Sequence, residues 1–246
     1  MSRATNPLAA KLRQFTDLPD RDIEILDRLI TETEVFEAGA DVIHEGSRVD
    51  WVNVVVDGML CRYHVLENGR RQITAFLVPG DMCDLHAFLL KEMDHSVGAL
   101  TTSRIAKIPR QTVLEITEKH HLLARAFWWA TMVDEAVLRQ WIVNVGRRTA
   151  YERTAHQFWE MFLRMTVVGH TQNNSFRFPV TQQDLADTLG MSIVHTNRTL
   201  QRLRAEGVVS MQNGAITVRD PDRLQAIAGF NPTYLHFYEH IGVRRV

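Results

Sequence analysis

Residues 180–210 read VTQQDLADTLGMSIVHTNRTLQRLRAEGVVS and contain two helical patterns that are separated by a break at Gly190. Thr181, followed three residues later by Asp184, forms an acidic variant of the capping box, which predicts a helix start. Gly190 is suited to the left-handed backbone that often ends a helix, and Ser192 is a good N-cap for a second helix. Two helices joined by a tight glycine turn predict a helix-turn-helix.

The residues after this turn extend the motif. We expect the second helix to pack inward through Val194, Leu203 and either Thr199 or Leu200. The next segment, VVSMQNGAITV, contains two strand-like runs around Asn213-Gly214, a pair that favours a two-residue hairpin. A hairpin directly after a helix-turn-helix predicts a winged helix-turn-helix, and DPDRLQAIAG predicts a short helix behind it.

The second helix carries side chains that suit DNA recognition. Arg198 can donate two hydrogen bonds to a guanine in the major groove, and His195 and Asn197 can bond base edges or phosphates. Ser192 lies at the helix N-terminus, where backbone N–H groups and the helix dipole favour a phosphate. The alternative is a solvated polar face in a helical domain, but the capped second helix and the wing favour DNA reading.

The first half of the chain has a different pattern. Residues 6–29 show apolar residues at helical spacing, which predicts short helices. Residues 34–109 contain short apolar or alternating runs that are separated by glycine turns, and Asn68-Gly69 between two of them is a strong hairpin signal. Evenly spaced short strands predict a small β-barrel or jelly roll.

A long helix is predicted between these two regions. Residues 120–145 read HHLLARAFWWATMVDEAVLRQWIVNV, without proline or glycine and with apolar residues on most faces of the helix. A helix that is apolar on several sides is covered on several sides, so we expect one face to pack on the roll and another on a second copy of the chain. Burial within one large domain is the alternative. Gly146, followed by Arg147 and Arg148, predicts the helix end, and Thr149 with Glu152 has the capping-box spacing that starts another helix.

These patterns divide the 246-residue chain into three parts. We expect an α+β protein with an N-terminal double-stranded β-helix (jelly-roll) sensor domain over residues 1–119. A long dimerisation helix and hinge over 120–147 and a winged helix-turn-helix domain over 148–246 are expected to follow. The net charge of −1 means that a local basic face must carry any binding to nucleic acid.

The composition also limits the compartment and the chemistry. The N-terminus lacks the apolar core of a signal peptide and no apolar run reaches the roughly 18 residues that span a bilayer, so we expect a cytoplasmic protein with no membrane contact. The two cysteines, Cys61 and Cys83, are too few for a disulfide scaffold or a four-cysteine metal site. We expect them to fill the roll as small apolar side chains, with a thiol redox switch as the alternative.

The motifs of common enzyme classes are absent from the sequence. We find no glycine-rich phosphate loop, nucleophile elbow or His-Glu-x-x-His pattern, and we therefore do not expect an enzyme. A DNA-binding transcription regulator is the leading interpretation. The alternative is a small-molecule or redox sensor that signals through protein–protein contacts.

We identify a resemblance to the Crp/Fnr transcription regulators. Their C-terminal helix-turn-helix is similar to LADTLGMSIVHTNRTLQRLRAEGVV here, particularly in members with a Ser-x-Val-His-x-Asn-Arg recognition helix. The segments FEAGADVIHEG, VVDGMLCRY and FLVPGDMCDLHAFL resemble the family's roll signatures. The order of roll, long helix and winged helix covers nearly the whole chain.

The resemblance implies a homodimer that binds a roughly two-fold symmetric site on double-stranded DNA, with contact to RNA polymerase as a further family property. By position, Ile193, Val194 and Arg198 match the family's base-reading residues, and Val194 replaces the glutamate of the best-known members. Because valine can contact a thymine methyl but cannot accept a hydrogen bond from cytosine, we expect a different DNA site. The predicted DNA-binding residues are Thr181, Gln182, Ser192, Ile193, Val194, His195, Asn197 and Arg198.

The resemblance also bears on the effector. In cyclic-nucleotide-binding relatives a Gly-Glu pair and an Arg-Ser pair hold the ribose and the phosphate, and the aligned positions here are Asp84-Leu85 and His95-Ser96. The missing arginine removes the bidentate phosphate donor, and Asp84 repels an anion, so we expect no cyclic nucleotide. The roll is expected to hold an unidentified small-molecule effector or none. The candidate effector-binding residues are Asp84, His86, His95 and Ser96.

We expect no bound metal or other cofactor. The oxygen-sensing branch of the family uses a set of N-terminal cysteines, and no cysteine precedes Cys61 here, which argues against an iron–sulfur cluster. His236 and His240 are spaced to share one helical face, but they lack a nearby third ligand.

Overall fold

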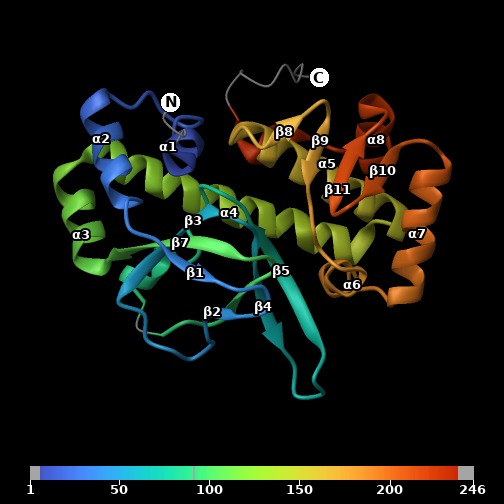
Figure 1. Cartoon of the computed structure of the whole chain (residues 1–246), viewed down its shortest axis with the longest axis horizontal. Coiled ribbons are helices and arrows are strands. Elements are labelled where there is room, and N and C mark those ends of the chain that lie inside the picture. Colours follow the sequence, from blue (N-terminus) through green and yellow to red (C-terminus); the bar gives the residue numbers. More distant parts are fainter. Residues whose placement is uncertain (1–5, 91, 238–246) are drawn as a thin grey trace.

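The computed structural model describes residues 6–90 and 92–237 (Figure 1). The elements of the first half are α1 (Pro7–Leu12), α2 (Asp20–Leu29), β1 (Glu34–Phe36), β2 (Asp41–Ile43), β3 (Trp51–Asp57), β4 (Leu60–Val65), β5 (Arg71–Leu77), the 3-10 helix η1 (Leu85–Phe88), β6 (Ser96–Ala99), β7 (Ser103–Pro109) and α3 (Arg110–Lys119). The elements of the second half are α4 (His121–Arg147), α5 (Ala150–Val167), β8 (Thr171–Gln172), β9 (Ser175–Arg177), α6 (Gln182–Leu189), α7 (Ile193–Ala205), β10 (Val209–Gln212), β11 (Ala215–Val218), α8 (Pro221–Ala228) and the 3-10 helix η2 (Pro232–Leu235).

The β-rich half consists of two antiparallel sheets with strand orders β1-β7-β3 and β2-β6-β4-β5. A cluster of buried apolar side chains from both sheets forms the core of the roll: Ile43, Val55, Leu60, Leu77, Val97 and Ile105. The predicted hairpin at Asn68-Gly69 joins β4 to β5, where Gly69 has a φ of +78°. The α+β class with an N-terminal roll is confirmed.

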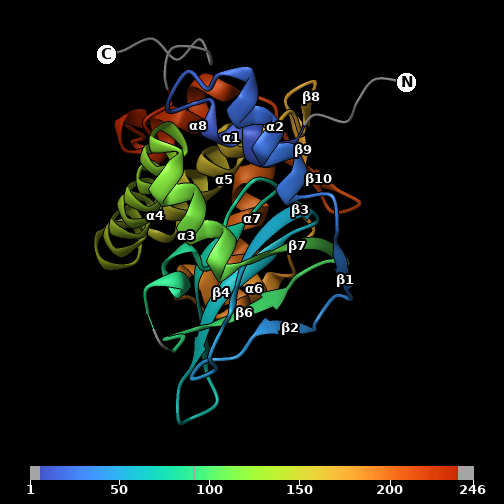
Figure 2. The same cartoon turned by 90° about the vertical axis from the view of Figure 1, so that its left-hand side faces the viewer.

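Helix α4 runs the length of the molecule along one side of the roll (Figure 1), and Figure 2 places it at the edge of the molecule. Its inner face packs on the roll and on α5 through buried side chains: Leu123, Phe127, Ala130, Val133, Val137 and Trp141. Its outer face exposes a second apolar set: Trp128, Met132, Leu138, Ile142 and Val145. The outer stripe has the spacing of a helix face that packs on another helix.

The predicted end of this helix, at Gly146 followed by Arg147 and Arg148, is confirmed. Gly146 is still helical, the helix ends at Arg147, and Arg148 has extended backbone with a ψ of 146°. A glycine inside a helix costs only about 1 kcal/mol relative to alanine, which a long, well-packed helix absorbs. The break is set instead by the capping box of α5, in which Thr149 N donates to Glu152 Oε2 at 2.8 Å and Glu152 N donates to Thr149 Oγ1 at 3.3 Å.

The C-terminal half contains a four-stranded sheet of order β10-β11-β9-β8. The polar composition of residues 169–179 favours a loop leading into one short strand, but these residues contain the β8–β9 hairpin, whose turn residues Asn173 and Asn174 have φ values of 50° and 56°. The predicted wing hairpin at Asn213-Gly214 is confirmed, and β11 pairs with β9 to extend the wing. Within the described residues, no helix is both long and apolar enough to cross a membrane.

Candidate DNA-binding surface and roll cavity

The helix-turn-helix is built by local hydrogen bonds at both ends of α6. Thr181 N donates to Asp184 Oδ2 at 2.9 Å and Asp184 N donates to Thr181 Oγ1 at 3.1 Å, which completes the predicted capping box. Gly190 ends α6 with a φ of +61°. A Cβ atom on Gly190 would lie 3.3 Å from Cγ1 of Val145, so the turn sits directly on the last turns of α4.

Helix α7 begins where predicted, because Ser192 Oγ accepts a hydrogen bond from His195 N at 3.2 Å. The buried side of α7 consists of Thr196, Thr199, Leu200 and Leu203. The expected packing role of Val194 is wrong: Val194 is 62% exposed and Ile193 is 45% exposed. The side chains of Ile193 and Val194 therefore project outward from the first turn of α7 and are accessible to a binding partner.

The polar residues of α7 lie beside these apolar ones. His195 and Arg198 are exposed, and Asn197 is half-buried and donates from Nδ2 to Gln182 Oε1 at 3.1 Å. Val194, His195 and Arg198 line a shallow groove between α7 and the start of α5. The structure thus brings all eight predicted DNA-binding residues to the N-terminal ends of α6 and α7.

The basic residues further along α7 have a different environment. Arg202 pairs with Glu206 at 2.8 Å and lies 3.9 Å above the ring of Tyr151, while Arg223 pairs with Glu206 at 2.6 Å. This cluster holds α7, α5 and α8 together. Arg198, in contrast, forms no ion pair with any residue in the described part of the chain, so its guanidinium is available to an outside acceptor.

An ion-pair cluster links the roll to the helix-turn-helix. Arg71 at the start of β5 pairs with Asp184 and, at 2.8 Å, with Asp187, both on α6. Gln72 Nε2 donates to the carbonyl of Thr188 at 3.3 Å. The β4–β5 hairpin therefore contacts the same helix that positions the recognition helix.

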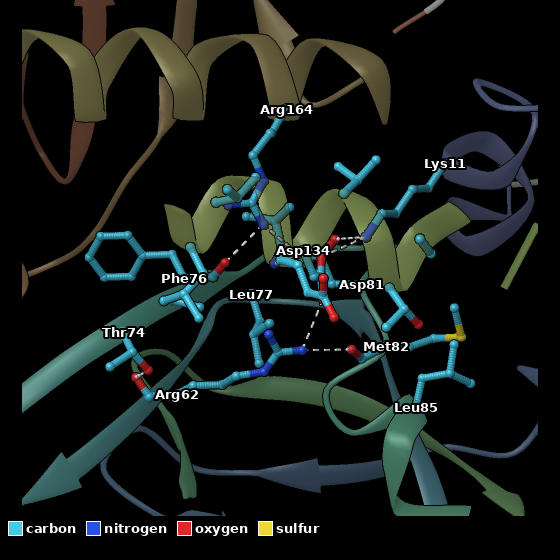
Figure 3. Close-up of a pocket in the computed structure, with 18 of the residues that line it drawn as sticks. Lys11, Arg62, Thr74, Phe76, Leu77, Asp81, Met82, Leu85, Asp134 and Arg164 are labelled. Atoms are coloured by element: carbon cyan, nitrogen blue, oxygen red, sulfur yellow. Dashed lines mark hydrogen bonds and ion pairs between the residues drawn. The ribbon is translucent and has the colours of Figure 1, made fainter. Parts of the chain in front are cut away.

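A cavity of about 420 Å³ lies between the roll, α4 and α5 (Figure 3). Arg62 of β4 reaches across it and donates to Asp134 Oδ2 on α4 at 3.0 Å and to the carbonyl oxygens of Met82 at 3.2 Å and Cys83 at 3.0 Å. This ion pair joins one wall of the roll to the long helix. The cavity combines apolar walls with a few charged groups, as small-molecule sites do.

A buried carboxylate on the wall of the same cavity joins three parts of the chain. Asp81 is 2% exposed and contacts Lys11 Nζ of α1 at 2.6 Å and Arg164 Nη2 of α5 at 2.7 Å. Burial alone raises the pKa of Asp81, but the charges of Lys11 and Arg164 outweigh it and hold the pKa below the ordinary value. Arg164 also donates to the carbonyl of Phe76 at 2.8 Å.

The four predicted effector-binding residues separate into two groups. Asp84 is fully buried and accepts hydrogen bonds from Asn53 N at 2.7 Å and Asn53 Nδ2 at 2.6 Å, and burial raises its pKa to about 6. Ser96 Oγ accepts from the backbone N–H of Glu45 at 3.0 Å. Both side chains form hydrogen bonds within the roll, and neither lines the cavity. His86 and His95 do line it.

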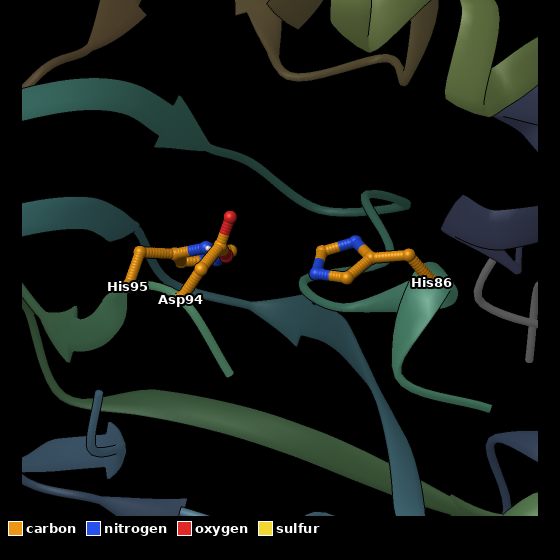
Figure 4. A group of neighbouring side chains, drawn as sticks. All are labelled: His86, Asp94 and His95. Carbon is orange, nitrogen blue, oxygen red and sulfur yellow. Dashed lines mark hydrogen bonds and ion pairs between the residues drawn. The ribbon is translucent and has the colours of Figure 1, made fainter. Parts of the chain in front are cut away.

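A third residue that the sequence did not single out joins these histidines. Asp94 Oδ1 lies 2.6 Å from His95 Nδ1, and His86 faces the pair (Figure 4). The sequence offered no signal for this group, because η1 and the residues before β6 meet only in the fold.

His236 follows a 3-10 helix with a φ of 49° rather than lying on an α-helical face, and His240 lies outside the described residues.

The two cysteines are buried in the roll. Burial raises the pKa of Cys61 to about 12 and the pKa of Cys83 well above its ordinary value. The reactive thiolate form is therefore strongly suppressed at neutral pH. Their positions fit the expectation of small apolar fillers: Cys61 lies 1% and Cys83 0% exposed.

Two protein families match separate parts of the chain. The Crp-like helix-turn-helix domain matches residues 152–227, and the cyclic nucleotide-binding domain matches residues 33–120. Both matches coincide with the winged helix and the roll described above.

Among characterised proteins, the nitrogen fixation regulation protein FixK of Bradyrhizobium diazoefficiens is 29% identical over 89% of this chain and 86% of its own length. The fumarate and nitrate reduction regulatory protein of Salmonella typhi is 24% identical over 86% of this chain and 84% of its own length. The solved structure of FixK2 from Bradyrhizobium japonicum has the same fold, with a TM-score of 0.72 and 24% identity over 80% of this chain and 96% of that one. A CRP-family regulator from Thermus thermophilus has a TM-score of 0.62 and 18% identity over 80% of this chain and 97% of that one.

Proposed function

The chain belongs to the Crp/Fnr family of transcription regulators, and we propose that two copies of it bind a two-fold symmetric DNA site through their α7 helices. It is a DNA-binding regulator and not an enzyme. The observation that carries the DNA-binding proposal is the N-terminal half of α7, where Arg198 is exposed and unpaired among the described residues, beside the exposed Ile193 and Val194. The proposal divides the chain into the roll (1–119), the dimer helix and hinge (120–147) and the DNA-binding domain (148–246).

Each residue of this surface has a distinct part in recognition. Arg198 donates two hydrogen bonds to a guanine, and Val194 packs on a thymine methyl. Ser192 and the free N–H groups of α7 hold a phosphate at the helix N-terminus. Gln182 fixes the amide of Asn197 at 3.1 Å, so that Asn197 is already oriented before DNA arrives.

The dimer is supported by the outer apolar stripe of α4, which contains Trp128, Met132 and Ile142. Solvated single helices do not keep so many large apolar residues on an exposed face, and such a patch marks a protein interface. Two α4 helices packed along this stripe place the α7 helices on one side of the dimer. The half-sites are then expected one DNA turn apart, about 34–36 Å.

The control of this regulator is proposed to lie in the roll cavity. The cyclic-nucleotide contacts of the family are not reproduced, since Asp84 is tied to Asn53 and His95 stands where an arginine would hold the phosphate. Any effector bound in the cavity touches Arg62 and Asp134 and therefore reaches α4 directly. We further propose RNA polymerase as the partner that converts DNA binding into transcription control, and the cytoplasm as the compartment where both occur.

Selection of bound sequences from a random DNA pool tests the proposal. We expect a two-fold symmetric site with a guanine in each half-site, bound specifically and with a steep dependence on salt. A site identical to that of relatives with glutamate at the Val194 position contradicts the assignment of Val194. Failure to select any sequence, with and without cell extract, contradicts the function itself.

A further inference from the structure

Three metal-binding side chains meet at one end of the roll cavity. His86 lies on η1, and Asp94 and His95 lie in the segment that leads into β6 (Figure 4). One potential ligand atom from each lies within 4.8 Å of the others. The ring centroids of His86 and His95 are 5.6 Å apart, with the His86 ring pointing toward the other two residues.

The hydrogen bonding of His95 leaves one nitrogen free. Its Nδ1 lies 2.6 Å from Oδ1 of Asp94, and because an ionised carboxylate can only accept, the N–H of His95 resides on Nδ1. The lone pair is then on Nε2, which is buried and has no hydrogen-bond partner in the described part of the chain. A buried acceptor without a donor destabilises a fold. His95 is itself 7% exposed, so this lone pair is held in place rather than solvated.

The nearest charged groups around the site are paired. Arg62 pairs with Asp134 at 3.0 Å, which offsets part of its positive charge. His64, whose ring centroid lies 6.4 Å from that of His95, is paired with Glu45 at 3.3 Å. The negative charge of Asp94 therefore remains beside the His95 ring.

We propose that His86 and the free Nε2 of His95 bind a divalent first-row transition-metal ion, while Asp94 holds the His95 ring through Nδ1. Imidazole nitrogen is a ligand that suits Zn²⁺, and a carboxylate on the second ring nitrogen is the usual partner of a metal-bound histidine. Metal–nitrogen bonds are about 2.0–2.1 Å long, so the two imidazoles move closer together when the ion binds, and water fills the remaining coordination positions. The proposal concerns the roll alone and does not depend on DNA recognition.

Equilibrium dialysis of the full chain against Zn²⁺, after removal of metals with a chelator, tests the site. We expect one ion per chain at low micromolar Zn²⁺. The variants H86Q and D94N are expected to lower the affinity at least tenfold, since even indirect ligand partners contribute that much. H44Q is the matched control, because His44 is on the same domain, 74% exposed and paired with Asp41. Co²⁺ in place of Zn²⁺ should give a visible absorption spectrum that changes in D94N.

Two variants, H86Q and D94N, are used so that misfolding of one of them does not prevent a conclusion. The Asp94 side chain is 79% exposed, so D94N is expected to retain the thermal melting temperature of the metal-free wild type. Lack of Zn²⁺ binding by the wild type overturns the proposal. Binding that persists unchanged in both H86Q and D94N also overturns it, because the ion would then lie elsewhere. Specific DNA binding is measured separately, so failure of the metal site leaves the proposed function untouched.

Discussion

The carboxylate of Asp81 offers the sharpest test of how the parts of this molecule are held together. It is buried and contacts Lys11 at 2.6 Å on one side and Arg164 at 2.7 Å on the other. The change Asp81→Asn keeps the size of the side chain and one oxygen acceptor but removes the charge. It therefore leaves two buried cations without their shared counter-ion.

The size of the effect follows from these contacts. Each buried hydrogen bond to a charged group contributes about 1.5–3 kcal/mol, and loss of one partner of a buried ion pair costs about 3–5 kcal/mol. Compensation is partial: Asp134 lies 3.8 Å from Lys11, and Glu160 lies 3.6 Å from Arg164. Burial raises the pKa of Glu160, so its charge is a weak substitute. We expect D81N to lower the free energy of unfolding by roughly 3 kcal/mol.

Urea unfolding followed by tryptophan fluorescence and by circular dichroism measures this change at pH 7. The control is Asp57→Asn, because the pair of Asp57 with Arg104 is 3.8 Å apart and more than half exposed, and exposed pairs contribute at most about 1 kcal/mol. The pKa of Asp81 is held below its unfolded value of 3.8. Its stabilisation is therefore present above that pH and is lost as the pH falls further, so wild type and D81N should converge in acid.

Two results would refute this reasoning. One is a loss of less than about 1 kcal/mol in D81N at pH 7, which would mean that Lys11 and Arg164 do not depend on Asp81. The other is a difference between wild type and variant that stays constant down to the lowest pH at which the protein folds.

Three further predictions concern the rest of the molecule. Arg198→Ala should weaken specific DNA binding by about 1–3 kcal/mol and relax the preference for guanine, whereas Arg204→Ala should cost less and affect all sequences alike; gel shifts on the selected site measure both. Ile142→Glu places a charge in the outer stripe of α4 and should convert a dimer into a monomer in light scattering, while Val35→Glu, at a similarly exposed position on the roll, should leave the mass unchanged. Asp84 has a folded pKa of about 6, above its unfolded value of 3.8, so its contribution to stability is full below pH 3.8 and is lost as the pH rises through 6. The change Asp84→Asn should remove roughly 2–3 kcal/mol of this pH dependence in urea unfolding, and an unchanged profile would contradict the burial argument.

Local patterns in the sequence predicted most of the secondary structure. The capping boxes at Thr149 and Thr181, the left-handed end at Gly190 and the hairpin at Asn213-Gly214 depend on residues within four positions of one another. Such interactions are visible in a sequence because the partners are neighbours along the chain. Gly146 indicated the end of α4 to within one residue for the same reason.

Contacts between distant residues could not be predicted in this way. Arg71 and Asp184 are 113 positions apart, and nothing in either segment signals the other. His86 and Asp94 are close in sequence, but their convergence depends on how η1 and the start of β6 fold over the cavity. The exposure of Val194 became clear only once the four buried positions of α7 were known.

The contact of Gly190 with Val145 fixes the position of the helix-turn-helix relative to α4. Because Gly190 lies directly against the side chain of Val145 near the end of α4, the orientation of the recognition helix follows that of α4. The 27 residues of α4 span about 40 Å, and inserting one residue would swing the DNA-reading surface by about 100° around the helix axis. The spacing of half-sites that a dimer accepts is therefore set by the length and phase of α4, far from any residue that touches a base.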